Sequence, residues 1–189
     1  MAIALNTLNI LSVNVENKIK IKVYITQVCE DVFSGPLTSP VQLIRMRLLT
    51  NMTVSNDHKH VLTSYIADLF QVLFTGNGST KFQVLKLFLN LSENPAMIEG
   101  LLGDHVDSSF LALFDGHVAK EILLRVLISL FQNINNCLKK EGHLAIQTTF
   151  TKGSLFFLLY GKDCAQKMRA SVNHYDVEVK EKVTIIPKF

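Results

Sequence analysis

The stretch Lys81–Met97, KFQVLKLFLNLSENPAM, predicts the fold because it combines a helix start, an apolar stripe and a helix end. Thr80 and Gln83 have the spacing of a capping box, in which each side chain satisfies a backbone N–H group at a helix N-terminus. Pro95 ends the pattern. A helix this apolar is not stable alone, so we expect it to be packed on both flanks. Its apolar side chains recur at helical spacing at Val84, Leu85, Leu87, Phe88, Leu89 and Leu91.

This pattern occurs four times along the chain. Copies aligned on Ser12, Thr53, Ser92 and Phe131 are separated by similar steps (53 − 12 = 41, 92 − 53 = 39 and 131 − 92 = 39). A period of about 40 residues is typical of the helical armadillo and HEAT solenoids. Three apolar columns keep this phase: Leu5, Met46, Leu85 and Leu124; Leu8, Leu49, Phe88 and Leu127; and Leu11, Met52, Leu91 and Leu130. A second, independent set precedes the later copies: Phe33 and Gly35, Phe74 and Gly76, and Phe114 and Gly116.

We therefore predict an all-α fold, a right-handed α-solenoid of about four armadillo repeats that forms a single domain over residues 1–189. The repeats are expected to end near residues 16, 57, 94 and 138, and a divergent C-terminal repeat follows. Residues 1–13 have the pattern of a third helix, so the first repeat is expected to be truncated and to have upstream sequence in the full protein.

Individual elements can be assigned within this scheme. Ser39 as N-cap, Pro40 at the first helical position and Gln42 completing a capping box predict a helix start. The last helix, at 176–186, ends before Pro187. The other expected elements are short helices at 17–25 and 26–33, a repeat over 58–94 with a turn at 76–78, a second helix at 108–114, a long third helix at 117–138, an insertion or loose loop at 139–152, and a helix at 155–160.

The composition agrees with a solenoid and argues against two other classes of protein. The chain is 48% hydrophobic and only 19% charged, which suits helices covered by neighbouring repeats. The net charge of +3 comes without a basic run interleaved with aromatic residues, so nucleic acid is not an expected partner. Apolar runs such as Leu155–Tyr160 are far shorter than a membrane span, which needs about 20 residues. We expect a soluble chain.

Three long strings carry a resemblance to a known family: LLTNMTVSND (48–57), YIADLFQVLFTGNGSTKFQVLKLFLNLSENPAM (65–97) and HVAKEILLRVL (117–127). They resemble the armadillo domain of the X-linked armadillo-repeat-containing (Alex) family and its autosomal relative. The resemblance implies a non-enzymatic, protein-binding solenoid behind an N-terminal hydrophobic anchor on the mitochondrial outer membrane, facing the cytosol. It implies roles in mitochondrial dynamics, distribution and transport, with the motor adaptors Miro and TRAK as partners.

The anchor is not part of this chain, so membrane attachment and localisation are expectations about the full protein. Pools in the nucleus or endoplasmic reticulum belong to the same expectation. The alternative is a nuclear or cytosolic adaptor that regulates cell growth or transcription factors through the same solenoid groove.

The third helices supply the predicted binding site. On each of them the apolar columns leave one polar face, on which residues four apart lie one above the other. Packed helices are about 8–10 Å apart, so one repeat would span about three residues of an extended peptide. An asparagine amide can both donate to and accept from a peptide backbone, and peptide-binding armadillo proteins resemble this arrangement. The polar face consists of Asn6 and Ile10, Arg47 and Asn51, Lys86 and Asn90, and Arg125 and Ser129.

Our hypothesis is that this groove presents a basic stripe to an acidic or phosphorylated segment of a partner. The chain departs from the peptide-binding pattern in three ways: Ile10 and Ser129 interrupt the asparagine ladder, and there is no Trp. The competing interpretation is that the cations are merely solvated and that the asparagines are bonded within the solenoid. The predicted partner-binding residues are Arg47, Asn51, Lys86, Asn90, Arg125 and Ser129.

A second non-enzymatic interpretation is a scaffold or oligomer contact made by apolar helix faces, with Val54 and the segment around Phe150 as candidates. The truncated first repeat would also leave an apolar edge at Leu5, Leu8 and Leu11, which predicts self-association.

An enzyme is not expected. The six histidines form no HExxH motif, and Cys29, Cys137 and Cys164 form no CxxC pair, which fits reduced thiols, with Cys29 in the core. The segment GNGSTK at 76–81 lacks the spacing of a phosphate-binding loop and a preceding strand. We therefore predict no catalytic residue, no metal site and no cofactor.

Overall fold

The structure is a computed structural model that describes residues 2–34, 39–114, 121–140 and 150–185. Within these ranges the side chains of residues 2, 56–58, 121–126, 140, 182, 184 and 185 are not described. Every named element of the described residues is helical, and the one isolated bridge there joins His105 to Ser154. The predicted all-α fold is confirmed.

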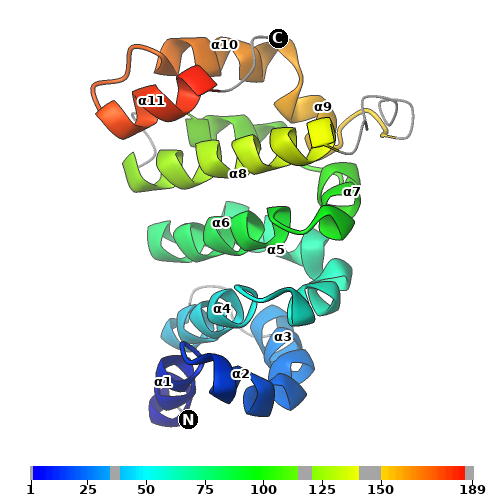
Figure 1. Ribbon diagram of the computed structural model, residues 1–189, viewed down its shortest axis with the longest axis vertical. Helices are drawn as coiled ribbons and strands as arrows, with labels where there is room; N and C mark the ends of the chain where they lie inside the picture. Colours follow the sequence, from blue (N-terminus) through cyan, green and yellow to red (C-terminus); the bar gives the residue numbers. More distant parts are fainter. Residues whose placement is uncertain (1, 35–38, 115–120, 141–149, 186–189) are drawn as a thin grey trace. The chain divides into compact units, whose positions relative to one another are not determined.

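The chain divides into two compact units, residues 1–94 and 95–189, and each is described by itself. In unit 1, α4 packs between α1 and α6, while α3 covers α4 and α5 covers α6 (Figure 1). This is the expected stacking of successive third helices. The elements of unit 1 are α1 (Ala2–Leu11), α2 (Val15–Ile21), η1 (Lys22–Tyr24), α3 (Ile25–Ser34), α4 (Pro40–Met52), η2 (Asn56–Tyr65), α5 (Ile66–Thr75) and α6 (Gly78–Ser92).

The apolar columns form the core of unit 1 where neighbouring helices cover them. Leu5 and Leu8 on α1 are half-buried and Leu11 is 43% exposed. Of the three residues of the predicted apolar edge, only Leu11 is exposed in the described part of the chain. The column residues of α4 and α6 are fully buried, namely Met46, Leu49, Met52, Leu85, Phe88 and Leu91.

The predicted start of the central helix was wrong by one turn. Asn77, not Thr80, is the N-cap of α6, and its Oδ1 accepts the Thr80 backbone N–H at 3.0 Å. Thr80 is buried in the first turn, where its Oγ1 donates to Asn77 Oδ1 at 3.2 Å. The error arose because Asn77–Thr80 and Thr80–Gln83 have the same three-residue spacing, and an asparagine caps a helix as well as a threonine does.

For the start of α4, the predicted N-cap and first helical residue are confirmed, but the predicted capping box is wrong. Ser39 is the N-cap, its Oγ accepts the Gln42 N–H at 3.1 Å, and Pro40 is the first helical residue. Gln42 does not complete the capping box: its side chain is buried, and its Nε2 donates to the Val32 carbonyl at 3.2 Å. Gln42 therefore joins the end of α3 to the start of α4.

Unit 2 is organised around α8. This helix contacts α7, η3 and α11, and α10 contacts η3, α9 and α11. The predicted second helix at 108–114 has the expected bounds but is a 3-10 helix, and α10 was not predicted. The predicted insertion falls mostly on residues outside the described part. The elements are α7 (Pro95–Gly103), η3 (Ser108–Phe114), α8 (Glu121–Lys140), α9 (Leu155–Leu159), α10 (Lys162–Ser171) and α11 (Val177–Ile185).

A short backbone clamp holds the loop after α7 against the start of α9. Val106 N–H donates to the Gly153 carbonyl and Leu155 N–H donates to the Asp104 carbonyl, each at 2.9 Å. Gly153 has a φ of +90°, and a Cβ atom there would lie 2.7 Å from His105 Nε2. Only glycine fits this position without strain.

Candidate functional site

The candidate site in unit 1 is the solvent side of α4 and α6. Because the core columns take up the buried stripe of each helix, the residues opposite them, spaced four apart, face outward together. Leu43, Asn51, Phe82 and Asn90 are half-buried, whereas Arg47 and Lys86 are exposed. We call this surface the α4–α6 face and define it by Leu43, Arg47, Asn51, Phe82, Lys86 and Asn90.

Neither cation of the face is neutralised by a described residue. Arg47 has no ion pair or hydrogen bond there, and Lys86 has only a ring contact, with its Nζ 5.4 Å from the centre of the Phe82 ring. Arg45, two residues from Arg47, differs: its Nη2 lies 3.2 Å from Asp31 Oδ2 and its Nη1 donates to the Asp31 carbonyl at 3.1 Å. Arg45 is thus committed to the contact between α3 and α4, while Arg47 and Lys86 remain available to a ligand.

The two asparagines use their amide N–H groups inside the unit. Asn90 Nδ2 donates to the Thr50 carbonyl at 2.9 Å and to Thr53 Oγ1 at 3.2 Å. Asn51 Nδ2 lies within hydrogen-bonding distance of Asn9 O, Asn9 Oδ1 and Ser12 Oγ. Each asparagine therefore ties its own helix to the end of the preceding third helix.

The acceptors of this tie repeat along the chain as well. Ser12 Oγ donates to Asn9 O at 2.7 Å, Thr53 Oγ1 donates to Thr50 O at 3.0 Å, and Ser92 Oγ donates to Leu89 O at 2.7 Å. A hydroxyl near each helix end thus turns toward the carbonyl three residues before it. At Ser12 and at Thr53, this hydroxyl and this carbonyl together accept the amide of the next asparagine, Asn51 and Asn90 respectively.

This arrangement changes what the asparagines can offer a partner. Their donors are used, as the competing interpretation expected, so they cannot donate to a peptide carbonyl. Their Oδ1 atoms accept no hydrogen bond from any described residue. The face therefore offers two cations and two amide oxygens, which complements carboxylates and backbone N–H groups.

The other two predicted site residues belong to unit 2. The side chain of Arg125 lies outside the described side chains. Ser129 is half-buried on α8 and has an interaction partner. The structure thus places Arg47, Asn51, Lys86 and Asn90 on one face of unit 1. Arg125 and Ser129 belong to α8 in unit 2.

A buried cation lies elsewhere in unit 1. The side chain of Lys59, on η2, is 1% exposed, and its Nζ is 3.6 Å from Glu93 Oε2 at the end of α6. Burial lowers the pKa of Lys59, and the Glu93 carboxylate opposes this shift. This pair was not predicted, because Lys59 lies in a polar stretch, NDHKH, that resembles a solvated turn.

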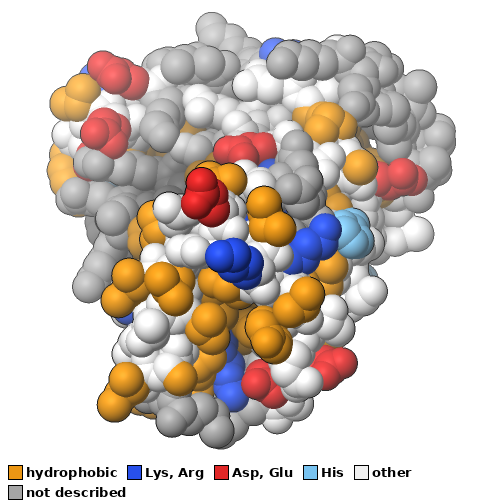
Figure 2. Space-filling view, turned by 60° about the horizontal axis from the view of Figure 1, so that its bottom comes forward, with side chains coloured by type: hydrophobic (Ala, Val, Ile, Leu, Met, Phe, Trp, Pro, Cys, Tyr) orange, Lys and Arg blue, Asp and Glu red, His pale blue; other side chains and the backbone are white. Residues whose placement is uncertain are grey.

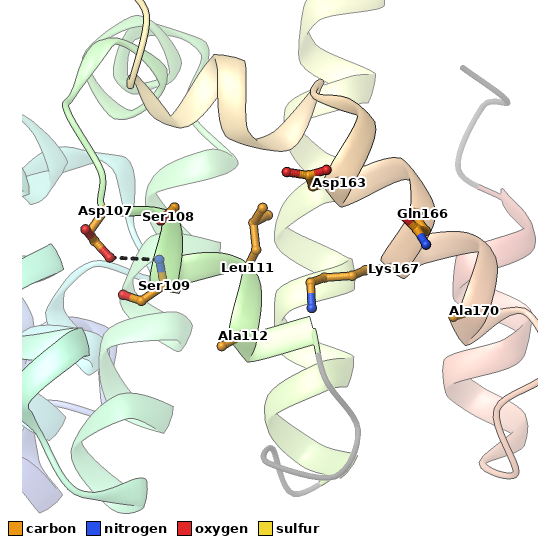
Figure 3. A pocket seen from close by; sticks show the side chains of 9 residues that line it. All are labelled: Asp107, Ser108, Ser109, Leu111, Ala112, Asp163, Gln166, Lys167 and Ala170. Atoms are coloured by element: carbon orange, nitrogen blue, oxygen red, sulfur yellow. Dashed lines mark hydrogen bonds between the residues drawn. The ribbon is translucent and has the colours of Figure 1, made fainter.

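Unit 2 contains a crevice of about 680 Å³ between η3 and α10 (Figure 3). Leu111 and Ala112 lie on its η3 side, and Asp163 and Lys167 extend from successive turns of α10. At its edge, hydrogen bonds from the Ser109 side chain and backbone N–H lower the pKa of Asp107. The lining mixes both signs of charge with small apolar side chains, so it does not favour one class of ligand.

The N-terminal end of unit 1 exposes an apolar surface. Figure 2 shows many hydrophobic side chains over this end of unit 1, with Lys, Arg, Asp and Glu side chains interspersed among them. Eight of the exposed large hydrophobic residues of the described chain lie between residues 3 and 24, and Val54 is exposed elsewhere in the unit. We call these eight the N-terminal edge: Ile3, Ile10, Leu11, Val13, Val15, Ile19, Val23 and Tyr24.

Potential metal ligands and thiols are present in the part of the chain that the structure describes. No group of three or more potential metal ligands occurs there. Burial raises the pKa of the Cys29 thiol and that of the Cys164 thiol to about 12 each, so both are protonated at neutral pH. Among the described helices, none has the length and apolar character needed to cross a bilayer.

Comparison with known proteins agrees with the repeat pattern. A family model described as armadillo-like matches residues 2–160. No solved structure matches the chain.

Proposed function

Because this chain belongs to the armadillo-like family, we propose that it binds an acidic, extended segment of a partner protein on its α4–α6 face. Armadillo-like solenoids are protein-binding scaffolds, and this family membership supports protein partners in general. Beyond protein binding in general, we propose where the contact lies, on the α4–α6 face, and that the bound segment is acidic.

The observation that supports it best is the pair of unneutralised cations. Arg47 and Lys86 occupy equivalent positions on two helices that pack against each other, and neither has an acidic partner among the described residues. Side chains that support only the fold would not need two like charges on adjacent helices, where they repel each other. A carboxylate or phosphate between them would remove this repulsion and gain two charge-assisted hydrogen bonds.

For the cellular role, we propose membership of the Alex group on the strength of the three quoted strings, which resemble that family and its autosomal relative, armadillo repeat-containing protein ten. That relationship would place the full protein on the mitochondrial outer membrane, facing the cytosol, in mitochondrial dynamics and transport. Miro and TRAK would then be the partners to test first. The alternative is a nuclear or cytosolic adaptor in growth or transcriptional control, which would use the same face with a different partner.

Charge reversal tests the site directly. The double variant Arg47→Glu, Lys86→Glu is expected to lose at least tenfold in affinity for a TRAK or Miro fragment, because each reversal replaces attraction by repulsion. Lys20→Glu, Arg169→Glu is the matched control, since it makes the same charge change at exposed positions that are not part of the face. Binding that is unchanged in the double variant, with the helical circular dichroism spectrum intact, would rule out this face.

Exchange mapping tests the partner without a mutation. Hydrogen–deuterium exchange on adding the TRAK or Miro fragment is expected to slow in the peptides that contain α4 and α6. If neither fragment protects any part of the chain, the proposed mitochondrial partners are wrong. Protection confined to η3 and α10 would move the contact to the unit 2 crevice.

A second proposed contact is self-association through the N-terminal edge. The specific observation in its favour is the concentration of exposed apolar residues there, since soluble monomers rarely expose large continuous apolar patches. The residues of this edge belong to α1, α2, η1 and the turn between α1 and α2, and none of them is part of the α4–α6 face as defined above.

A further inference from the structure

The α4–α6 face consists of three rows that cross the two helices. Each row has one residue from α4 and the equivalent residue 39 positions later on α6 (82 − 43 = 39, 86 − 47 = 39 and 90 − 51 = 39). Leu43 and Phe82 form an apolar row, Arg47 and Lys86 form a cationic row, and the Oδ1 atoms of Asn51 and Asn90 form an acceptor row. A ligand that lies across both helices meets each kind of group twice, at one fixed interval.

That interval follows from how closely the helices pack. The hydrogen bond from Asn90 Nδ2 to Thr50 O, 2.9 Å long, holds α6 directly against α4. Helices in direct contact have axes about 8–10 Å apart. Equivalent groups on the face therefore recur at about this distance, and a ligand needs side chains of one kind at the same spacing.

The interval selects one backbone conformation. In a β-strand, side chains recur on the same side after two residues, about 6.7 Å along the strand. The side chain three residues along points to the opposite side. An α-helix returns to the same side after seven residues, about 10.5 Å, but its interior N–H groups are already bonded and cannot reach the asparagine oxygens. A polyproline II segment has three residues per turn and rises about 9.3 Å per turn, with its N–H groups free.

We infer that the α4–α6 face recognises a polyproline II segment that carries acidic residues at every third position. The inference rests on the function proposed above and specifies its ligand. The carboxylates of residues i and i+3 pair with Arg47 and Lys86, and backbone N–H groups with the same three-residue period donate to Asn51 and Asn90 Oδ1. At the positions that donate, the ligand cannot have proline.

The apolar row gives the segment a third contact. Phe82 is half-buried, and Lys86 Nζ lies over its ring at 5.4 Å, so an aromatic surface is placed beside a cation. Grooves that bind polyproline II segments are lined by aromatic side chains on which proline rings pack. One of the two positions between successive acidic residues therefore tolerates proline, while the other supplies the N–H group.

The test compares labelled peptides of identical composition in which two glutamates are two, three or four positions apart, with a peptide carrying glutamine at both positions as reference. Fluorescence anisotropy at low ionic strength, where surface ion pairs are least screened, measures the affinities for the full chain. The three-residue spacing is expected to bind about fivefold more tightly than the other two, which is the gain from a second exposed ion pair. In Lys86→Glu this preference is expected to disappear.

The outcomes separate the inference from the proposed function. Equal affinity for all three spacings, or a preference for two or four, overturns the inference and leaves an acidic ligand in place. If no glutamate peptide binds better than the glutamine reference, the proposed function itself fails. N-methylation of each intervening residue in turn is expected to weaken binding at one of the two positions only, and equal tolerance at both would exclude the contact with the asparagine oxygens.

Discussion

At the scale of single residues, burial decides which polar groups are available for chemistry. Lys59 and Lys86 are both lysines of unit 1, but one has its stem and ammonium enclosed and the other is exposed. Burial works against the charged form, so Lys59 depends on Glu93, whereas Lys86 depends on no carboxylate. The same reasoning separates Arg45, which serves the fold, from Arg47, which faces solvent.

Lys59 supports a prediction about stability and pH. Burial lowers the pKa of Lys59 in the folded chain below its ordinary value of 10.5. At pH values between the folded pKa and 10.5, the unfolded chain therefore binds more protons than the folded chain. Stability from this residue therefore rises with pH as pH approaches 10.5. Lys59→Met is expected to raise the free energy of unfolding at pH 7 by about 1 kcal/mol, and its advantage should shrink as pH rises in urea titrations.

The partner of Lys59 provides the control for this prediction. Glu93→Gln leaves the buried ammonium without a carboxylate and is expected to lower the free energy of unfolding by about 1–2 kcal/mol at pH 7. If Lys59→Met and Glu93→Gln change stability in the same direction, the pair is not a buried cation neutralised by an exposed carboxylate.

The cysteines give a second prediction at this scale. Cys29 and Cys164 are fully buried, and burial raises the pKa of each to about 12, so neither forms a thiolate at pH 7–8. Cys137 is half-buried. In a titration with a thiol reagent, Cys137 is expected to react first in the native chain, and Cys29 and Cys164 only in denaturant. Rapid native modification of Cys29 detected by mass spectrometry would contradict its place in the core.

At the scale of elements, the asparagine tie connects one third helix to the next. Asn90 Nδ2 satisfies the Thr50 carbonyl and Thr53 Oγ1 on α4. Asn90→Ala leaves the carbonyl without this donor and is expected to lower the free energy of unfolding by about 1–2 kcal/mol. Asn173→Ala, at an exposed position, is the control and should change stability by less than about 0.5 kcal/mol. Equal effects in urea denaturation would show that the tie does not stabilise the stack.

The elements also show what the sequence can predict. The columns through Met46 and Leu85 were predictable because a helix that is covered on both flanks must be apolar at fixed intervals, and this constraint acts along the whole chain. The N-cap of α6 was not predictable, because Asn77 and Thr80 are both suitable N-cap residues and lie one turn apart. The choice depends on Thr80 being buried, which is a property of the packed unit.

Helical spacing predicted a common face for Arg47 and Asn51, and for Lys86 and Asn90. It left open whether the asparagine amides bond to a partner or within the solenoid. The direction in which each asparagine amide donates depends on residues 37 to 42 positions earlier, among them Ser12 and Thr50. Sequence reasoning could have found this from the hydroxyl that recurs at Ser12, Thr53 and Ser92, which had served only to align the repeats.

At the scale of the whole molecule, the repeat architecture explains where unburied apolar surface remains. A repeat buries its apolar face only against a neighbouring repeat. In unit 1, α4 packs against both α1 and α6, whereas α1 packs mainly against α4 and makes a smaller contact with α2. The exposed residues of the N-terminal edge lie on α1, α2, η1 and the turn between α1 and α2.

The N-terminal edge predicts association that depends on concentration. Burying apolar surface yields about 25 cal/mol per Å², so a second copy seated on the edge would be stabilised, and charges placed within it would oppose the contact. In sedimentation velocity experiments the chain is expected to form larger species as its concentration rises, and Ile10→Glu, Ile19→Glu should remain monomeric. Val54→Glu, at a position 59% exposed outside the edge, is the matched control and should associate like the unmodified chain. If Val54→Glu prevents association instead, the contact lies on that part of unit 1, and if all variants associate equally, apolar burial at the edge does not drive it.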